Sequence, residues 1–233
     1  MESIFDSIRK MFVPIRHEGF PFIGAALFIA VFFGWFWQPI FWIGLIFTAW
    51  CIYFFRDPKR VTPLGPGVVV SPADGRISAV AIGVAPKELG LGEQSRRRIS
   101  VFMNVFDCHV NRAPLAGTIS RIAYTPGTFL NAELDKASEN NERNGFVLDT
   151  EHGPVGVVQI AGLVARRIVC FVGEGDALAP GQRIGMIRFG SRVDVYLPVA
   201  ADVLVAEGQT MIAGETVIAR FGEEAVEQHV RID

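Results

Sequence analysis

Hydrophobic residues dominate one long early stretch of the chain. Residues 19–55 form a run of 37 positions without Asp, Glu, Lys, Arg or His. Gln38-Pro39 divides this run, because proline lacks an amide hydrogen and restricts the residue before it. The pattern therefore predicts two helices, Phe20–Trp37 and Ile40–Phe55, of roughly 27 and 24 Å at about 1.5 Å per residue. A bilayer core is about 30 Å thick, so each helix is just long enough to cross or enter a membrane.

Basic residues flank this apolar segment on both sides, and by the positive-inside tendency both flanks stay cytoplasmic. Two crossings and a re-entrant hairpin satisfy this equally. A cleaved signal peptide is the alternative, but the run is far longer than a signal core and no small-residue cleavage site follows it. The sequence predicts a retained helical hairpin, residues 1–60, in the cell (inner) membrane, with the remaining chain on the cytoplasmic side. The flanking residues are Arg9, Lys10, Arg16, Arg56, Lys59 and Arg60.

Beyond residue 60 the pattern changes to short β-branched runs punctuated by Gly and Pro, such as "GVVVSPADGRISAVAIGV", "GPVGVVQIAG" and "RVDVYLP". Short strands separated by turn signals are typical of a barrel or sandwich. We therefore predict a mainly β domain over residues 61–233. Two late stretches, "LAPGQRIGMI" and "VAEGQTMIAGETVIARF", resemble the half-barrels of biotinyl and lipoyl carrier domains.

A carrier domain needs a lysine at a hairpin tip to hold its cofactor. None of the lysines lies in the half-barrel region, which argues against a carrier. The lysines are Lys10, Lys59, Lys87 and Lys136.

Composition excludes several other classes of protein. The formal net charge of −2 and the lack of a long basic block argue against a nucleic-acid partner. Three cysteines, an odd number without metal-ligand spacing, argue against a disulfide framework and against a zinc site. The histidines are scattered without an HxxxH pattern, so we predict no metal centre. The 50% hydrophobic content agrees with a membrane segment.

Candidate chemistry lies in four short motifs: "SPADGR" (71–76), "NVFDCHVNRAP" (104–114), "NNERNGFVLDTEHGPV" (140–155) and "IRFGSRVDVYLP" (187–198). Taken singly, each motif has a structural explanation, since Asp-Gly and Gly-Ser are ordinary turn pairs. Together and in this order they resemble the phosphatidylserine decarboxylase family, from about Phe54 to Pro198. The compact length resembles the short bacterial, archaetidylserine decarboxylase-like form.

The resemblance implies that the Gly190-Ser191 bond cuts itself. Ser191 would become an N-terminal pyruvoyl group, the covalent cofactor, and no added cofactor is required. The products would be a β chain of residues 1–190 and an α chain of residues 191–233, which form a heterodimer; further dimerisation is left open. The pyruvoyl ketone would condense with the substrate amine and accept the electron pair left by departing carbon dioxide. The implied reaction converts phosphatidylserine to phosphatidylethanolamine, with a phospholipid and the membrane as partners.

The resemblance also suggests roles for individual residues. His109, in the family's Asp-x-His position, is the candidate general acid, and Asp74 matches an aspartate associated with self-cleavage. The longer enzymes carry a second histidine where this chain has Arg112. Either His109 serves both self-cleavage and decarboxylation, or another residue replaces the second histidine, and His152 is the candidate.

A phosphodiester and a carboxylate both attract cations. The candidate substrate-binding residues are Arg112, Arg143 and Arg192.

Three alternatives stay open at this point. A pyruvoyl enzyme of this kind could act on archaetidylserine or on a soluble amino acid, although the apolar hairpin disfavours a soluble substrate. A non-enzymatic reading is a membrane-tethered β-barrel adaptor, in which Gly190-Ser191 is only a turn. An intact purified chain would favour the adaptor, and a chain cut at Gly190-Ser191 would favour the enzymes.

Overall fold

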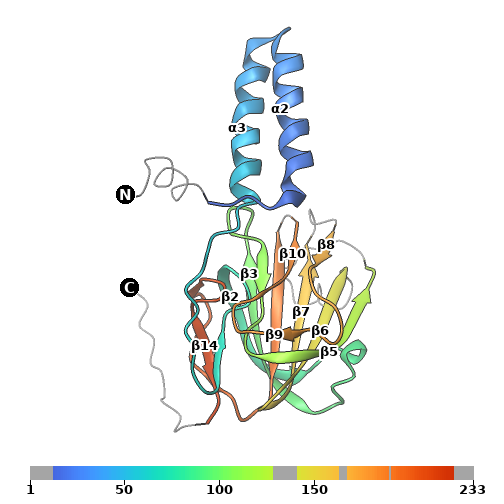
Figure 1. The fold of residues 1–233 in the computed structure, drawn as a ribbon, viewed down its shortest axis with the longest axis vertical. Coiled ribbons are helices and arrows are strands. Elements are labelled where there is room, and N and C mark those ends of the chain that lie inside the picture. The colour runs from blue at the N-terminus through green and yellow to red at the C-terminus, as the bar shows by residue number, and fades with distance from the viewer. Residues whose placement is uncertain (1–12, 128–140, 163–166, 189, 223–233) are drawn as a thin grey trace, which may run out of the picture. The chain divides into compact units, whose positions relative to one another are not determined.

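The computed structural model describes residues 13–127, 141–162, 167–188 and 190–222. The chain forms two compact units, residues 1–59 and 60–233 (Figure 1). The first is helical and the second is built almost wholly of strands.

The first unit is a helical hairpin, in which a short 3-10 turn, η1 (His17–Gly19), leads into the antiparallel helices α2 (Phe20–Gly34) and α3 (Gln38–Phe54) (Figure 1). The second helix begins earlier than predicted, because Gln38-Pro39 opens α3 instead of forming the turn. Proline is tolerated there because the first turn of a helix has no partner for its N–H groups in any case. The turn itself is made by residues 35–37.

Small residues let the two helices approach closely. A Cβ atom at Gly44 would overlap the Ala30 side chain, and Ala26 and Ala30 are buried. The large apolar side chains on the outside of the hairpin are exposed, among them Phe28, Phe32, Trp35, Trp42, Ile43 and Ile46. By length and composition the helical segment His17–Gly34 is able to span a membrane, while Gln38–Phe54 is a shorter apolar helix. Small residues between helices and bulky apolar residues outside suit a lipid environment.

An eight-stranded antiparallel sheet forms the centre of the second unit and curls around its core (Figure 1). Its strand order is β13-β2-β3-β11-β7-β6-β5-β9. The mainly β fold predicted from the sequence is therefore confirmed. The strands are β2 (Gly75–Val84), β3 (Ser95–Met103), β5 (Gly117–Thr125), β6 (Arg143–Thr150), β7 (Gly153–Ala161), β9 (Ala177–Leu178), β11 (Ser191–Leu197) and β13 (Thr210–Met211).

Two three-stranded sheets complete the unit, with strand orders β1-β14-β12 and β4-β10-β8. Their strands are β1 (Val68–Val70), β4 (Val110–Arg112), β8 (Ile168–Cys170), β10 (Arg183–Ile187), β12 (Asp202–Val203) and β14 (Val217–Arg220).

Strand β11 lies at the centre of the large sheet and is buried on both faces. It pairs with β3 on one side and β7 on the other, and all seven of its residues are buried. Side chains alternate between the faces of a strand. Val193, Val195 and Leu197 accordingly point into the main core, whereas Tyr196 packs in a second cluster with Leu89 of the 3-10 turn η2 (Lys87–Leu89).

Candidate active site

The Gly190-Ser191 bond lies where the chain passes from one sheet to another. Strand β10 of a small sheet ends at Ile187, and β11 of the large sheet begins at Ser191. Gly190 has φ +64°, in the left-handed region that glycine adopts without steric cost. A Cβ atom there would meet nothing within 4 Å. The backbone angle, and not a lack of space, is therefore what favours glycine at this position.

Both backbone polar groups of Gly190 are hydrogen-bonded. Its N–H donates to Nε2 of His109 at 3.3 Å, and its carbonyl oxygen accepts from the N–H of Gly162 at 3.0 Å. A donor on this oxygen draws electron density from the carbonyl carbon that precedes Ser191. The contact resembles the oxyanion donors that stabilise tetrahedral intermediates in acyl transfer.

His109 is fully buried and comes directly before β4. Its Nδ1 lies 3.0 Å from the carbonyl oxygen of Asp107, so this nitrogen carries the proton and Nε2 is left as an acceptor. Its backbone carbonyl accepts from the N–H of Ile187 at 3.2 Å, which aligns the residue with the end of β10. The pairing of β4 with β10 thus carries the His109 ring to Gly190.

Ser191 is fully buried, and its Oγ has no hydrogen-bond partner among the described residues. Its Cα partners are Met103 on β3 and Ala161 on β7, both part of the main core. A buried hydroxyl without a partner is uncommon, because leaving it unsatisfied costs free energy. Because this hydroxyl also directly follows the hydrogen-bonded carbonyl of Gly190, it fits a nucleophile.

Asp74 lies at the same end of the large sheet. Gly75, which follows it and begins β2, has φ +137° and sits so close to β3 that a Cβ atom would overlap the carbonyl of Phe102. Met103 follows on β3 and pairs with Ser191. Two strand spacings, about 10 Å, therefore separate the Asp74-Gly75 segment from Ser191 across the sheet.

The Asp74 carboxylate is held by two partners. Nη2 of Arg60 lies 2.9 and 2.7 Å from its two oxygens, and the N–H of Ala213 donates to Oδ1 at 2.7 Å. Sequence reasoning counted Arg60 only as a flanking charge of the membrane segment. Its short distance along the chain from a motif aspartate was the signal that could have suggested this pairing.

Arg192 does not lie on the Ser191 side of β11. Consecutive strand residues point to opposite faces, and Arg192 instead forms a two-pronged ion pair with Asp194, from Nε to Oδ1 at 2.8 Å and from Nη2 to Oδ2 at 3.0 Å. Both residues are buried. A contact between Arg192 and the substrate stays a prediction, which this ion pair does not favour.

The other two predicted arginines also have partners within the protein. Arg112 is buried and donates to the carbonyl oxygen of Gly181 at 2.8 Å, and Arg143 pairs with Glu88 at 2.7 Å. Arg143 and Arg192 each have Ile160 as a Cα partner, so they share the outer face of the sheet, opposite to Ser191. Arg143 and Arg192 therefore lie away from the Ser191 hydroxyl, and Arg112 is engaged within the small sheet.

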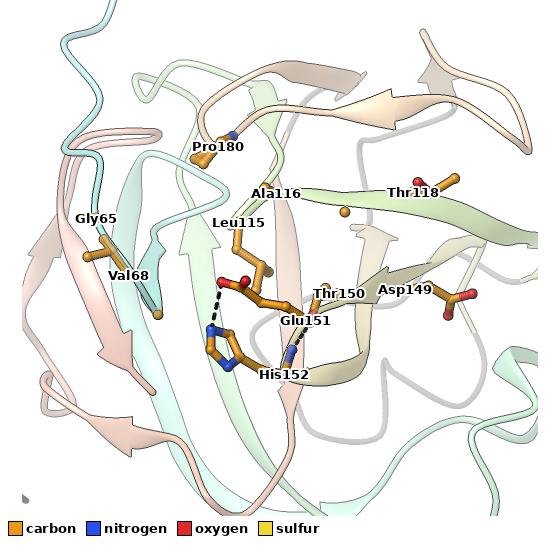
Figure 2. Close-up of a pocket in the computed structure, with 12 residues that line it drawn as sticks. Gly65, Val68, Leu115, Ala116, Thr118, Asp149, Thr150, Glu151, His152 and Pro180 are labelled. Atoms are coloured by element: carbon orange, nitrogen blue, oxygen red, sulfur yellow. Dashed lines mark hydrogen bonds and ion pairs between the residues drawn. The ribbon is translucent and has the colours of Figure 1, made fainter. Parts of the chain in front are cut away.

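His152 lies at the turn between β6 and β7, at the other end of the sheet from Ser191. Its Nε2 is 3.2 Å from Oε1 of Glu151. Its ring stacks on the ring of Phe221, with 4.4 Å between the two ring centroids. Both His152 and Glu151 line a cavity of about 300 Å³. Figure 2 shows their side chains among the residues that line it. His152 directly precedes β7, whereas Ala161, the residue opposite Ser191, ends it. The length of the strand therefore separates His152 from Ala161 by roughly 27 Å. The role of His152 as the replacement for the missing histidine stays a prediction, which this distance does not favour.

The buried Arg192–Asp194 pair yields a stability prediction. Asp194→Ala should lower the free energy of unfolding by about 3–5 kcal/mol, because Arg192 keeps a buried charge without its partner. The double variant Arg192→Met/Asp194→Leu should recover most of this loss, since no buried charge remains. Thermal melting of the full chain in detergent measures both. A double variant no more stable than Asp194→Ala would contradict the explanation.

The stretch that carries these residues matches a known family. Residues 47–219 match the family model described as phosphatidylserine decarboxylase. The chain belongs to the phosphatidylserine decarboxylase family. Phosphatidylserine decarboxylases are carboxy-lyases of phospholipid metabolism, so the chain is an enzyme and the adaptor alternative is set aside. The matched range contains Asp74, His109 and the Gly190-Ser191 bond.

Phosphatidylserine decarboxylases generally depend on a pyruvoyl group. The residues present fit such a group, since Ser191 offers a buried hydroxyl that no described residue hydrogen-bonds, and the preceding carbonyl accepts from Gly162. Within the described part of the chain, no three His, Cys, Asp or Glu side chains are grouped so as to hold a metal ion.

Proposed function

We propose that this decarboxylase processes itself at Gly190-Ser191 and then converts phosphatidylserine to phosphatidylethanolamine. The observation that carries the proposal is the environment of Gly190. This left-handed residue donates its N–H to His109 and accepts from Gly162, and the Ser191 hydroxyl that follows has no hydrogen-bond partner among the described residues. An ordinary turn requires neither the His109 contact nor the unsatisfied hydroxyl.

Cleavage would begin when Ser191 Oγ attacks the carbonyl carbon of Gly190. The Gly162 N–H stabilises the negative charge that develops on the carbonyl oxygen. His109 Nε2 takes the hydroxyl proton and returns it to the Ser191 nitrogen, the C–N bond breaks, and an ester joins Gly190 to Ser191 Oγ. Loss of the Ser191 Cα proton then breaks the Cβ–O bond and releases Gly190 as a carboxylate. Water replaces the nitrogen of the resulting dehydroalanine, and ammonia leaves.

The pairing of the strands explains why the two product chains would stay together. After the cut, β11 belongs to the α chain, yet it remains between β3 and β7 of the β chain. Strand β14 likewise pairs with β1, and Ala213 donates to Asp74 across the two chains. We therefore propose a stable heterodimer of residues 1–190 and 191–233, in which Asp74 helps to join the chains at the active-site end.

In decarboxylation the pyruvoyl ketone supplies an electrophilic carbonyl that binds the substrate amine and accepts the electron pair of the departing carboxylate. His109 is the residue that we assign to return a proton to the substrate carbon, because its Nε2 faces the residue before Ser191. We assign none of the three predicted arginines to the substrate, because each is engaged by the protein's own groups.

The helical hairpin supports a lipid substrate and a membrane location. Its outer side chains are bulky and apolar, and an anchor of this kind keeps the enzyme at the surface where a phospholipid headgroup is concentrated. We propose that the hairpin holds the enzyme in the cell (inner) membrane with the second unit on the cytoplasmic side. The same argument disfavours a soluble amino acid as substrate.

The test uses the purified full chain with detergent-dispersed phosphatidylserine carrying a labelled carboxyl group. We expect release of labelled carbon dioxide, and we expect phenylhydrazine, which reacts with ketones, to abolish it. Archaetidylserine and free serine are offered in parallel. Their rates of decarboxylation show whether the enzyme selects its substrate by the glycerol backbone or by the lipid tails. Release from free serine alone would overturn the lipid assignment, and activity that resists phenylhydrazine would overturn the pyruvoyl mechanism.

A further inference from the structure

One peptide unit connects Asn141 to the carbonyl of Gly190. Asn141 is 1% exposed, and its Nδ2 donates to the carbonyl oxygen of Ala161 at 2.7 Å. The N–H of the same peptide unit belongs to Gly162, and it donates to the carbonyl oxygen of Gly190 at 3.0 Å. The Asn141 side chain, the Ala161–Gly162 peptide and the bond to be cut therefore form one chain of hydrogen bonds.

Hydrogen bonds in such a chain strengthen one another. A donor on the carbonyl oxygen of an amide increases the partial positive charge on its N–H, which then becomes a better donor. The effect is larger in a buried site, where water does not compete. Asn141 thus acts on the Gly190 carbonyl through the Ala161–Gly162 peptide.

The contact also sets the direction of the Gly162 N–H. Strand β7 ends at Ala161, and Gly162 continues its register opposite Gly190, where the Gly162 N–H makes one ladder hydrogen bond and the Gly190 N–H donates to His109 instead. The N–H of Ala161 donates to the backbone carbonyl of Glu142 at 3.0 Å, and the Asn141 amide holds the next peptide from its carbonyl side. The segment around Asn141 thus ties down the end of β7 at two successive peptides.

We infer that Asn141 is a positioning residue for self-cleavage, which aims and strengthens the Gly162 N–H that stabilises charge on the Gly190 carbonyl. The inference rests on the proposed self-cleavage at Gly190-Ser191. It assigns a role to the asparagine that precedes Glu142 and Arg143, where sequence reasoning considered only the arginine.

The first test compares two matched variants. Asn141→Leu keeps the approximate shape of the side chain and removes the donor. Asn144→Leu makes the same change at another buried asparagine, whose Nδ2 donates to Gln159 at 3.2 Å. Both chains are synthesised in a cell-free system with detergent, and the uncut fraction is followed by gel and intact mass. Removal of a direct oxyanion donor costs about 10²–10³ in rate, so we expect Asn141→Leu to slow cleavage on the order of ten-fold and Asn144→Leu to leave it within about two-fold.

A second variant separates the role in chemistry from a role in folding. In Asn141→Asp the carboxylic acid form can donate to Ala161 and the carboxylate cannot. The cleavage rate relative to wild type should therefore fall as the pH rises through the pKa of the new carboxyl. A side chain that merely fills space would give a ratio that does not change with pH. This arm decides the question if Asn141→Leu fails to fold.

The outcomes distinguish the two claims. A wild-type chain that is never cut removes the proposed function and the inference with it. A wild-type chain that is cut, together with an Asn141→Leu variant cut at the same rate, overturns the inference alone. Equal slowing in Asn141→Leu and Asn144→Leu also overturns it, because general loss of packing then explains the effect.

Discussion

Ser191→Ala leaves the chain uncut and without decarboxylase activity. The variant lacks the only atom that can attack the Gly190 carbonyl from position 191, and it cannot form a pyruvoyl group. The loss should be complete, whereas most substitutions change a rate by a finite factor. Intact mass spectrometry of freshly purified protein should show one chain of about 25.6 kDa for the variant and two chains split after Gly190 for the wild type.

Ser100→Ala is the matched control for this experiment. Ser100 is buried on the neighbouring strand β3, its Oγ also has no hydrogen-bond partner among the described residues, and it pairs with Asp194 of β11. It lies on the other face of the sheet from Ser191, so this variant should be cut normally. An intact wild-type chain that nevertheless releases carbon dioxide from phosphatidylserine would refute self-cleavage as the source of activity.

His109→Gln slows self-cleavage by about 10²–10⁴, the usual contribution of a positioned acid or base. Glutamine can still fill much of the space and contact Gly190, but it cannot carry a proton between the hydroxyl and the leaving nitrogen. Because self-cleavage precedes decarboxylation, the two effects must be measured separately. The time course of processing reports the first step, and activity per molecule of cut protein reports the second.

His152→Gln provides the comparison for His109→Gln. The same change of residue type occurs roughly 27 Å from Ser191, at the far end of β7, so processing should proceed at the wild-type rate. If His152→Gln blocked cleavage while His109→Gln did not, the assignment of the proton carrier to His109 would fail. It would also mean that the hairpin between β6 and β7 occupies another position in the active enzyme.

Local sequence was sufficient for the features that depend on local physics. A charge-free run of 37 residues predicts buried or lipid-facing helices whatever surrounds it, and only the position of Pro39 within the hairpin was misjudged. Short β-branched runs between glycines likewise predict strands. The glycine before Ser191 could be linked to a special backbone conformation, because a positive φ is a property of single residues.

Contacts between distant segments were decided by the tertiary structure. One such set of contacts joins Asp74 to Arg60 and Ala213, and another joins Asn141 to the Ala161–Gly162 peptide. The segments that meet there depend on how every strand pairs. A shift of one residue in that register would exchange the two faces of a strand. No short motif contains this information, since the register is set by burial of the whole core.

Sequence by itself thus determined the helical hairpin and the mainly β unit, and it predicted Gly190-Ser191 with His109 as the candidate site. The alternation along β11 could also have shown that Arg192 faces away from Ser191, because it requires only the period of a strand. Only the tertiary structure decided that His152 is remote, that the three arginines are engaged, and that the Ala161–Gly162 peptide connects Asn141 to the Gly190 carbonyl. The physical reason is that backbone conformation follows from near neighbours, whereas hydrogen bonds across a sheet follow from the pairing of strands far apart in the chain.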